Sequence, residues 1–106
     1  MDTVPLIHGK KCGRGQYTYK NGDRYDGDWV DDKRHGHGVF YFANGDRYDR
    51  DFVDDNYHGH GVFYYANGNR YDGDYVDDKR HGHGVLYNAD GSYYEGEWSE
   101  GVEVKN

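Results

Sequence analysis

The chain repeats one pattern of 23 residues three times in strict phase. The full copies are residues 25–47, 48–70 and 71–93, and each begins with a tyrosine followed by an aspartate. Self-similarity at a fixed short period is typical of arrays of small supersecondary units that bury their faces against their neighbours. The period therefore predicts a repeat architecture.

Half-copies flank the three full copies. Residues 12–24 match the second half of the unit, and residues 94–101 match the first half. We therefore place the repeat array at residues 12–101, with an N-terminal extension at 1–11 and a C-terminal tail at 102–106.

The aliphatic content by itself would suggest disorder. Leu, Ile, Val and Phe make up only 16 of the 106 residues, and the net charge is −7. Low hydrophobicity with high net charge is the signature of chains that cannot form a core. Here 13 Tyr and 2 Trp supply the missing apolar surface. Because the rings recur at fixed phase, the sequence predicts a thin, ordered, aromatic core.

Alternating side chains predict β-strands. In the first full copy Tyr25, Gly27 and Trp29 alternate with Asp26 and Asp28. This period of two places rings on one face of a half-buried strand and carboxylates on the other.

The same alternation from residue 36 to 42 predicts a second strand in each copy, followed by Asn44-Gly45. Asn-Gly favours a type I′ hairpin turn. The other connection, residues 31–35, is longer and polar, and its Asp32 is expected in the left-handed conformation, as are Asp55 and Asp78. The predicted fold is all-β: an elongated single sheet of antiparallel hairpins, twisted and curled, with an aromatic groove.

Glycines share the ring-bearing face of the predicted sheet. Gly27, Gly36 and Gly38 leave slots into which neighbouring rings can lie. In the second copy Arg50 occupies the position of Gly27, so we expect a local bend there or an arginine stacked on a ring.

At these residues the chain resembles the MORN (membrane occupation and recognition nexus) repeat family, whose pattern is close to YxGxWxxGxxxGxGxxxxxxGxx. The resemblance covers roughly residues 9–101. The matching positions are Tyr25, Gly27, Trp29, Gly36, Gly38, Gly45, Tyr71, Gly73, Gly82, Gly84 and Gly91. The departures are Asp32, Asp55 and Asp78 for a turn glycine, Arg50 for glycine, and Phe52 and Tyr75 where Trp is common.

The resemblance implies a scaffold with a groove. Proteins of this family occur in radial spoke heads of motile cilia, in parasite cytoskeletal assemblies and in junctional membrane proteins. They also occur as extensions of phosphatidylinositol phosphate kinases and of a lysine methyltransferase. No kinase or methyltransferase segment accompanies the repeats here, so we expect no enzyme activity. A detached repeat region of a phosphatidylinositol phosphate kinase-like protein stays an alternative.

The ring-bearing face is the candidate binding site. Tyr and Trp give large contact area at little entropic cost, and a curled sheet lined with them suits a helix or an extended peptide of a protein partner. The alternative interpretation is that the rings only fill the core. The predicted groove residues are Tyr25, Trp29, Phe40, Phe42, Tyr48, Phe52, Tyr71, Tyr75 and Trp98.

Three His-Gly-His steps, at residues 35–37, 58–60 and 81–83, have a spacing compatible with metal chelation. A solvated role is favoured, because no third ligand is provided. Protonation of the seven histidines near pH 6 would cancel the net charge, so assembly is expected to respond to pH. No metal, cofactor or catalytic residue is predicted.

The net charge of −7 disfavours binding to nucleic acid and to anionic membranes. Peripheral membrane or phosphoinositide binding nevertheless stays the main alternative function. Cys12 is the single cysteine, and no apolar run approaches the roughly 20 residues of a membrane span. We expect a cytoplasmic protein of a cytoskeletal or axonemal assembly, with self-association through the terminal half-copies.

Overall fold

The computed structural model describes residues 2–104, which contain strands and turns only. The strands are β1 (Leu6–Ile7), β2 (Lys10–Lys11), β3 (Gly13–Thr18), β4 (Arg24–Val30), β5 (Lys33–Tyr41), β6 (Arg47–Val53), β7 (Asn56–Tyr64), β8 (Arg70–Val76), β9 (Lys79–Tyr87), β10 (Tyr93–Ser99) and β11 (Val102–Glu103).

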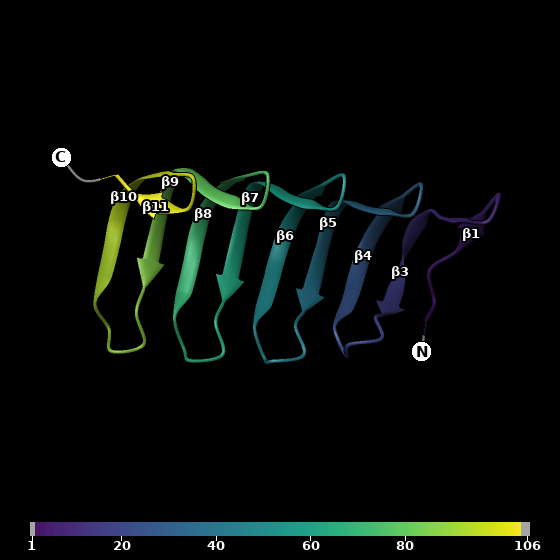
Figure 1. Cartoon of the computed structure of the whole chain (residues 1–106), viewed down its shortest axis with the longest axis horizontal. Helices are drawn as coiled ribbons and strands as arrows, with labels where there is room; N and C mark the ends of the chain where they lie inside the picture. Colours follow the sequence, from purple (N-terminus) through teal and green to yellow (C-terminus); the bar gives the residue numbers. More distant parts are fainter. Residues whose placement is uncertain (1, 105–106) are drawn as a thin grey trace.

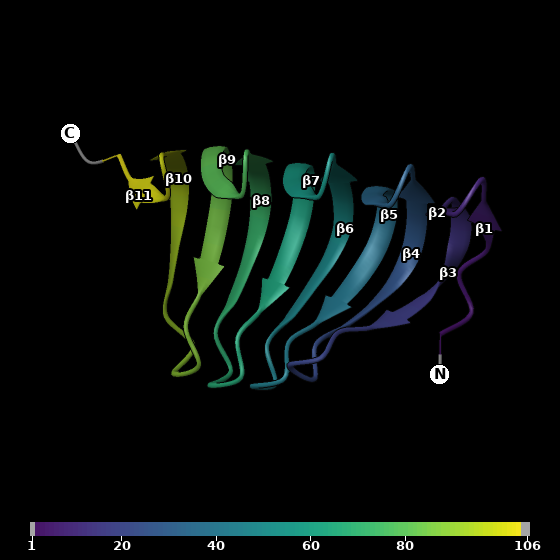
Figure 2. The same ribbon diagram turned by 45° about the vertical axis from the view of Figure 1, so that its right-hand side comes forward.

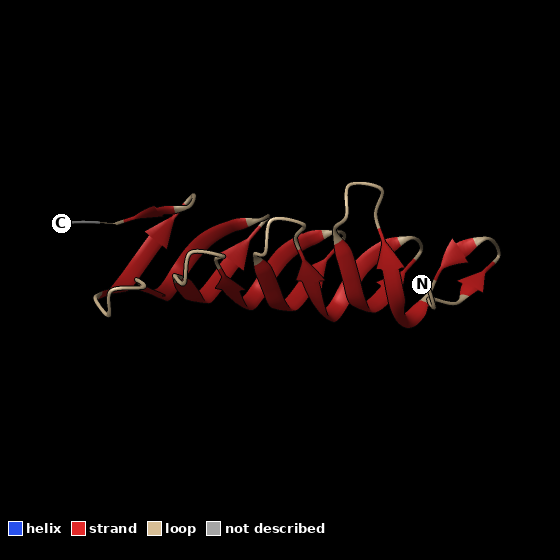
Figure 3. Ribbon diagram, turned by 90° about the horizontal axis from the view of Figure 1, so that it is seen from below, coloured by secondary structure: helices blue, strands red, loops and turns tan. Residues whose placement is uncertain are grey.

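Strands β3 to β11 form one nine-stranded sheet in which each strand pairs with its neighbours in sequence (Figure 1). All of these pairings are antiparallel, and β1 and β2 form a separate small hairpin. The molecule measures 51 × 24 × 17 Å, and the two termini lie at opposite ends of its long axis (Figures 1 and 2). The strands are strongly curved (Figure 3). The predicted all-β array of hairpins is confirmed.

The connection between β4 and β5 is a two-residue turn. Val30 pairs with Lys33, and the intervening Asp31 and Asp32 have φ angles of 48° and 68°. Positive φ at both central residues is the requirement of a type I′ turn, whose twist matches that of the flanking strands. The left-handed conformation predicted for Asp32, and likewise for Asp55 and Asp78, is confirmed. The longer connection predicted over residues 31–35 is wrong, because β5 already begins at Lys33.

The Asn-Gly turns are not type I′. Phe42 accepts a hydrogen bond from the Gly45 N–H at 3.0 Å and donates to the Asp46 carbonyl at 2.9 Å, which closes a three-residue loop. Only the glycine has a positive φ, of 99°. The Asn44 side chain instead accepts a hydrogen bond from the Asp46 N–H at 2.9 Å, an Asx turn that holds this residue outside the left-handed region.

Tyrosine rings fill the glycine slots, as predicted. A β-carbon added to Gly38 would lie 2.1 Å from the Tyr25 hydroxyl oxygen, and the equivalent distance for Gly61 and Tyr48 is 2.2 Å. Each tyrosine ring therefore lies over a glycine of the next strand. A single sheet can in this way bury its own rings without a second sheet or a helix packed against it.

Arg50 departs from both expectations. Its side chain is exposed, and among residues 2–104 no ring contact involves its guanidinium. The register shift at this point also occurs beside Gly27 and Gly73, so it is no special bend. The arginine instead has a φ of 132°, which is unusual for a residue with a side chain.

Candidate functional site

The ring-bearing face of the sheet contains a continuous row of buried aromatic side chains. The Tyr25 ring makes edge-to-face contacts with Trp29 and Phe52, both at 5.1 Å between centroids. Tyr48 contacts Phe52 and Tyr75 in the same way, at 5.1 and 5.3 Å. Because each tyrosine touches rings on both sides, the row links the copies along the array, and edge-to-face geometry adds to its stability.

Three hydroxyl groups of this row donate hydrogen bonds to backbone carbonyls. Tyr25 donates to the Asp28 carbonyl at 3.0 Å, and Tyr48 and Tyr71 donate to the corresponding carbonyls of Asp51 and Asp74. Burial raises the pKa of Tyr71 to about 12, and it also raises the pKa of Tyr25 and Tyr48. These hydroxyls are therefore structural, neutral donors at physiological pH.

The structure places all nine predicted groove residues in or against this row. Eight of them are at most 5% exposed and form the core. Phe42 alone is half-buried and packs against the core from outside. Contact of the eight core rings with a partner stays a prediction, and the accessible part of the face belongs to other residues.

A second layer of half-buried side chains covers the core row, and we call it the outer aromatic layer. The ring centroid of Phe42 lies 4.7 Å from that of Phe40 and 5.6 Å from that of Phe63, and the ring centroid of Phe63 lies 4.6 Å from that of Tyr65. Sequence reasoning missed most of this layer, although several of its members occupy the same repeat positions as core rings: Tyr17, Phe63 and Leu86 are equivalent to Phe40, and Tyr94 is equivalent to Tyr25. Its members are Tyr17, Tyr19, Phe42, Tyr57, Phe63, Tyr65, Leu86 and Tyr94.

Basic side chains lie over the rings beside the type I′ turns. The Lys11 ammonium is 4.4 Å from the Tyr17 ring centre. The Arg34 guanidinium is 4.8 Å from the Phe40 ring, and that of Arg80 is 4.5 Å from Trp98. Such cation–ring contacts stabilise by roughly 0.5–2 kcal/mol, depending on desolvation.

The second aspartate of each of three type I′ turns accepts a hydrogen bond from a backbone N–H that follows the preceding turn; these residues are Asp32, Asp55 and Asp78. The Asp32 carboxylate accepts the Lys11 N–H at 2.7 Å, and Asp55 accepts the Arg34 N–H at 2.8 Å. Asp55 also pairs with the guanidinium of Arg34, at 3.1 Å from Nε. The aspartate therefore does more than tolerate a left-handed backbone, because it joins adjacent copies.

In the second copy a tyrosine replaces the basic residue. Tyr57 stands at the position equivalent to Arg34, and its ring stacks on Tyr48 with centroids 3.9 Å apart. Asp78 keeps the backbone hydrogen bond, from the Tyr57 N–H at 2.8 Å.

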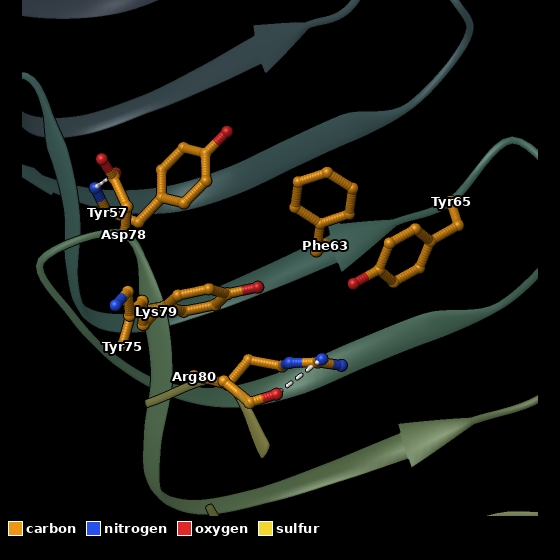
Figure 4. Close-up of a pocket in the computed structure, with 8 residues that line it drawn as sticks. Tyr57, Phe63, Tyr65, Tyr75, Asp78, Lys79 and Arg80 are labelled. Atoms are coloured by element: carbon orange, nitrogen blue, oxygen red, sulfur yellow. Dashed lines mark hydrogen bonds between the residues drawn. The ribbon is translucent and has the colours of Figure 1, made fainter. Parts of the chain in front are cut away.

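A cavity of about 240 Å³ opens on this face next to Tyr57 (Figure 4). Four rings of the second and third copies surround it, and the other lining residues come from the turn regions after β8 and β10. The lining residues are Tyr57, Phe63, Tyr65, Tyr75, Asp78, Lys79, Arg80 and Gly101.

The opposite face carries the carboxylates and histidines. The His37 Nε2 atom lies 3.2 Å from Oδ1 of Asp51, and the His60 Nε2 atom lies 2.9 Å from Oδ1 of Asp72. The His83 Nε2 atom lies 3.4 Å from Oε2 of Glu95. Within residues 2–104 no group of three His, Cys, Asp or Glu side chains is placed to hold a metal ion. The histidines therefore pair with carboxylates across neighbouring strands.

Comparison with known proteins identifies the repeat. The family model of the MORN repeat matches residues 7–24, 25–47, 51–70, 71–93 and 94–104. No curated protein matches the chain. The part of the chain that the structure describes contains no helix long and apolar enough to cross a membrane.

Proposed function

Because the chain belongs to the MORN repeat family, we propose that it is a non-catalytic scaffold that binds a helix or extended peptide of a protein partner. MORN repeats serve as modules for interaction with membranes or proteins, and the chain consists almost entirely of them. The observation that supports a protein partner is the outer aromatic layer, whose half-buried rings run across consecutive copies on one face. Rigid aromatic side chains are the preferred anchors of protein interfaces.

We place this scaffold in a cytoskeletal or axonemal assembly, in keeping with the elongated shape of 51 Å and the regular spacing of its copies. Self-association through the terminal half-copies belongs to the same proposal. Membrane or phosphoinositide binding is the second candidate, and the net charge of −7 argues against it, since anionic lipid attracts basic clusters.

The experiment compares two double variants in capture from a lysate. Phe42→Ala with Tyr65→Ala truncates the outer aromatic layer, and Tyr41→Ala with Tyr64→Ala truncates equally half-buried rings on the opposite face. We expect the first pair to lose a partner that the second pair keeps, with both retaining the β-sheet circular dichroism signal.

Flotation with phosphoinositide vesicles at physiological pH decides between the two candidates. Salt-sensitive flotation of the wild-type chain would overturn the protein-partner proposal in favour of a membrane module. If the chain does not float with the vesicles and captures a protein partner, the two results support the scaffold proposal.

A further inference from the structure

One position of the repeat places a cation over aromatic rings in every unit except the second full copy. The equivalent residues 11, 34, 57 and 80 are Lys, Arg, Tyr and Arg. In the first full copy the Arg34 guanidinium lies 4.8 Å from the Phe40 ring and 5.6 Å from Phe52, and it pairs with Asp55. The first copy thus shows what this geometry accommodates: a planar cation over two rings with a carboxylate at its edge.

The second copy keeps the rings and the carboxylate without the cation. The Tyr57 ring stacks on Tyr48, with its centroid 3.9 Å away, and also contacts Phe63 at 6.2 Å and Tyr75 at 5.5 Å, so an uncharged ring forms one wall where the first copy has a guanidinium. The rings equivalent to those under Arg34 are Phe63 and Tyr75, and both line the 240 Å³ cavity together with Asp78.

The third copy has the cation but lacks the carboxylate. Arg80 is a cation beside Gly101, at the position where residues 32, 55 and 78 are aspartate. Within residues 2–104 its guanidinium donates one hydrogen bond, to the Gly101 carbonyl at 2.9 Å. The neighbouring Lys79 pairs with Glu100 at 3.2 Å. Among residues 2–104 no ion pair within 4.0 Å involves Asp78 or Arg80. One cavity is therefore bordered by an unmatched carboxylate and an unmatched guanidinium.

We propose that this cavity binds an extended segment of the protein partner through an arginine and an acidic residue. The arginine enters the cavity against Asp78 and the rings that line it, a counterpart of the Arg34 environment in the first copy with Tyr57 at the position of the arginine, and the acidic side chain pairs with Arg80. This inference rests on the proposed scaffold function and specifies the chemistry of its partner.

Both charged residues, Asp78 and Arg80, line one cavity of about 240 Å³, so the two matching charges of the ligand must lie close together. In an extended peptide, side chains two residues apart project to the same side, roughly 6–7 Å from each other. The matching segment is therefore Arg-x-Asp or Arg-x-Glu.

The test titrates the full chain with a blocked nine-residue peptide, Arg-Ala-Glu flanked by Gly and Ser, and follows amide shifts by NMR. We expect saturable shifts at residues around the cavity. Replacing the peptide's arginine by citrulline, which removes the charge and keeps the shape, is expected to weaken binding about tenfold, since a hydrogen bond to a charged group contributes about 1.5 kcal/mol or more. Replacing its Glu by Gln is expected to act in the same direction.

Three variants of the protein complete the test. Asp78→Asn keeps a residue that tolerates the left-handed turn and removes only the charge, so binding should weaken about tenfold. Tyr57→Arg supplies the chain's own guanidinium, as in the first copy, and should abolish binding. Asp55→Asn makes the same chemical change where Arg34 is the internal partner, and should leave the peptide affinity unchanged.

Equal binding of the arginine and citrulline peptides would overturn the inference, as would equal effects of Asp78→Asn and Asp55→Asn. If those results come with partner loss in the Phe42→Ala, Tyr65→Ala variant, the scaffold function stands and only the charge recognition fails. If that variant also retains every partner, the proposed function fails with it.

Discussion

The first and second full copies are nearly the same sequence, yet they solve two local problems differently. At the ring-face position where the first copy has Gly27, the second has Arg50, and at the position of Arg34 the second has Tyr57. The first copy places an arginine–aspartate pair over its rings, whereas the second places a further, half-buried ring there, next to a cavity. The same backbone design therefore presents either a charged pair or an aromatic wall on this face, and the difference depends on single side chains.

The largest expected effect is alkaline unfolding, to which the additional tyrosine of the second copy, Tyr57, contributes. Burial raises the pKa of Tyr71 to about 12 and raises those of Tyr48, Tyr57 and Tyr75 above their ordinary value. A phenol with a raised folded-state pKa stabilises the fold fully below pH 10, and this contribution is lost as pH rises from 10 through 12 and beyond.

We expect the urea midpoint to be constant from pH 8 to about 9.5 and to fall steeply above pH 10. In Tyr57→Arg the fall should be shallower than in the wild type, because one buried phenol is gone. A midpoint that does not change up to pH 12 would contradict the burial of these hydroxyls.

Among single substitutions, we expect the largest loss of stability when Gly27 of the first copy is replaced by arginine, the residue of the second copy at this position. A β-carbon at Gly27 would lie 2.4 Å from the Gly38 Cα and 2.6 Å from both the His37 carbonyl and the Tyr25 hydroxyl. We expect Gly27→Arg to lower the free energy of unfolding by about 3 kcal/mol, as overpacked or strained positions do. Urea denaturation measures it, and a loss below about 0.5 kcal/mol would show that the slot adapts freely.

The reverse change should stabilise the second copy. Arg50 holds a φ of 132° with an exposed side chain, and within residues 2–104 its guanidinium makes no hydrogen bond, ion pair or ring contact that would offset this backbone strain. Arg50→Gly should raise the free energy of unfolding by about 1 kcal/mol, since relief of strain exceeds the added entropy of the unfolded chain. Thermal and urea unfolding of the single variant measure the gain, and Arg50→Lys is the control that should show none.

The smallest effect distinguishes the two turn aspartates. Gly101 shows that glycine suits this position, with a φ of 86°. Asp55→Gly removes the carboxylate that pairs with Arg34, while Asp78→Gly removes only an acceptor of the Tyr57 N–H. We expect Asp55→Gly to be less stable than Asp78→Gly by about 0.5 kcal/mol, the size of a partly exposed ion pair. Equal stabilities would mean that the Arg34 pair contributes nothing measurable.

Local periodicity predicted much of this molecule correctly. The alternation around Tyr25 and Trp29 located strand β4 and its buried face, and the shared phase of rings and glycines predicted the slot that Gly38 provides. Turn chemistry was less predictable, because Asn-Gly is compatible with two hairpin loops and a side-chain hydrogen bond to Asp46 selects between them. Apart from Phe42, the outer aromatic layer was missed, since the same repeat positions and ring types occur in both layers and the local pattern does not distinguish buried from half-buried rings.

The sequence by itself determined the repeat, the strands and the face on which rings gather, because period-two alternation and a 23-residue period are properties of the chain alone. The tertiary structure decided which rings are core and that Asp78 and Arg80 border one cavity. Those outcomes depend on contacts between residues about 20 positions apart, and strand curvature and side-chain direction set such contacts where local pattern cannot.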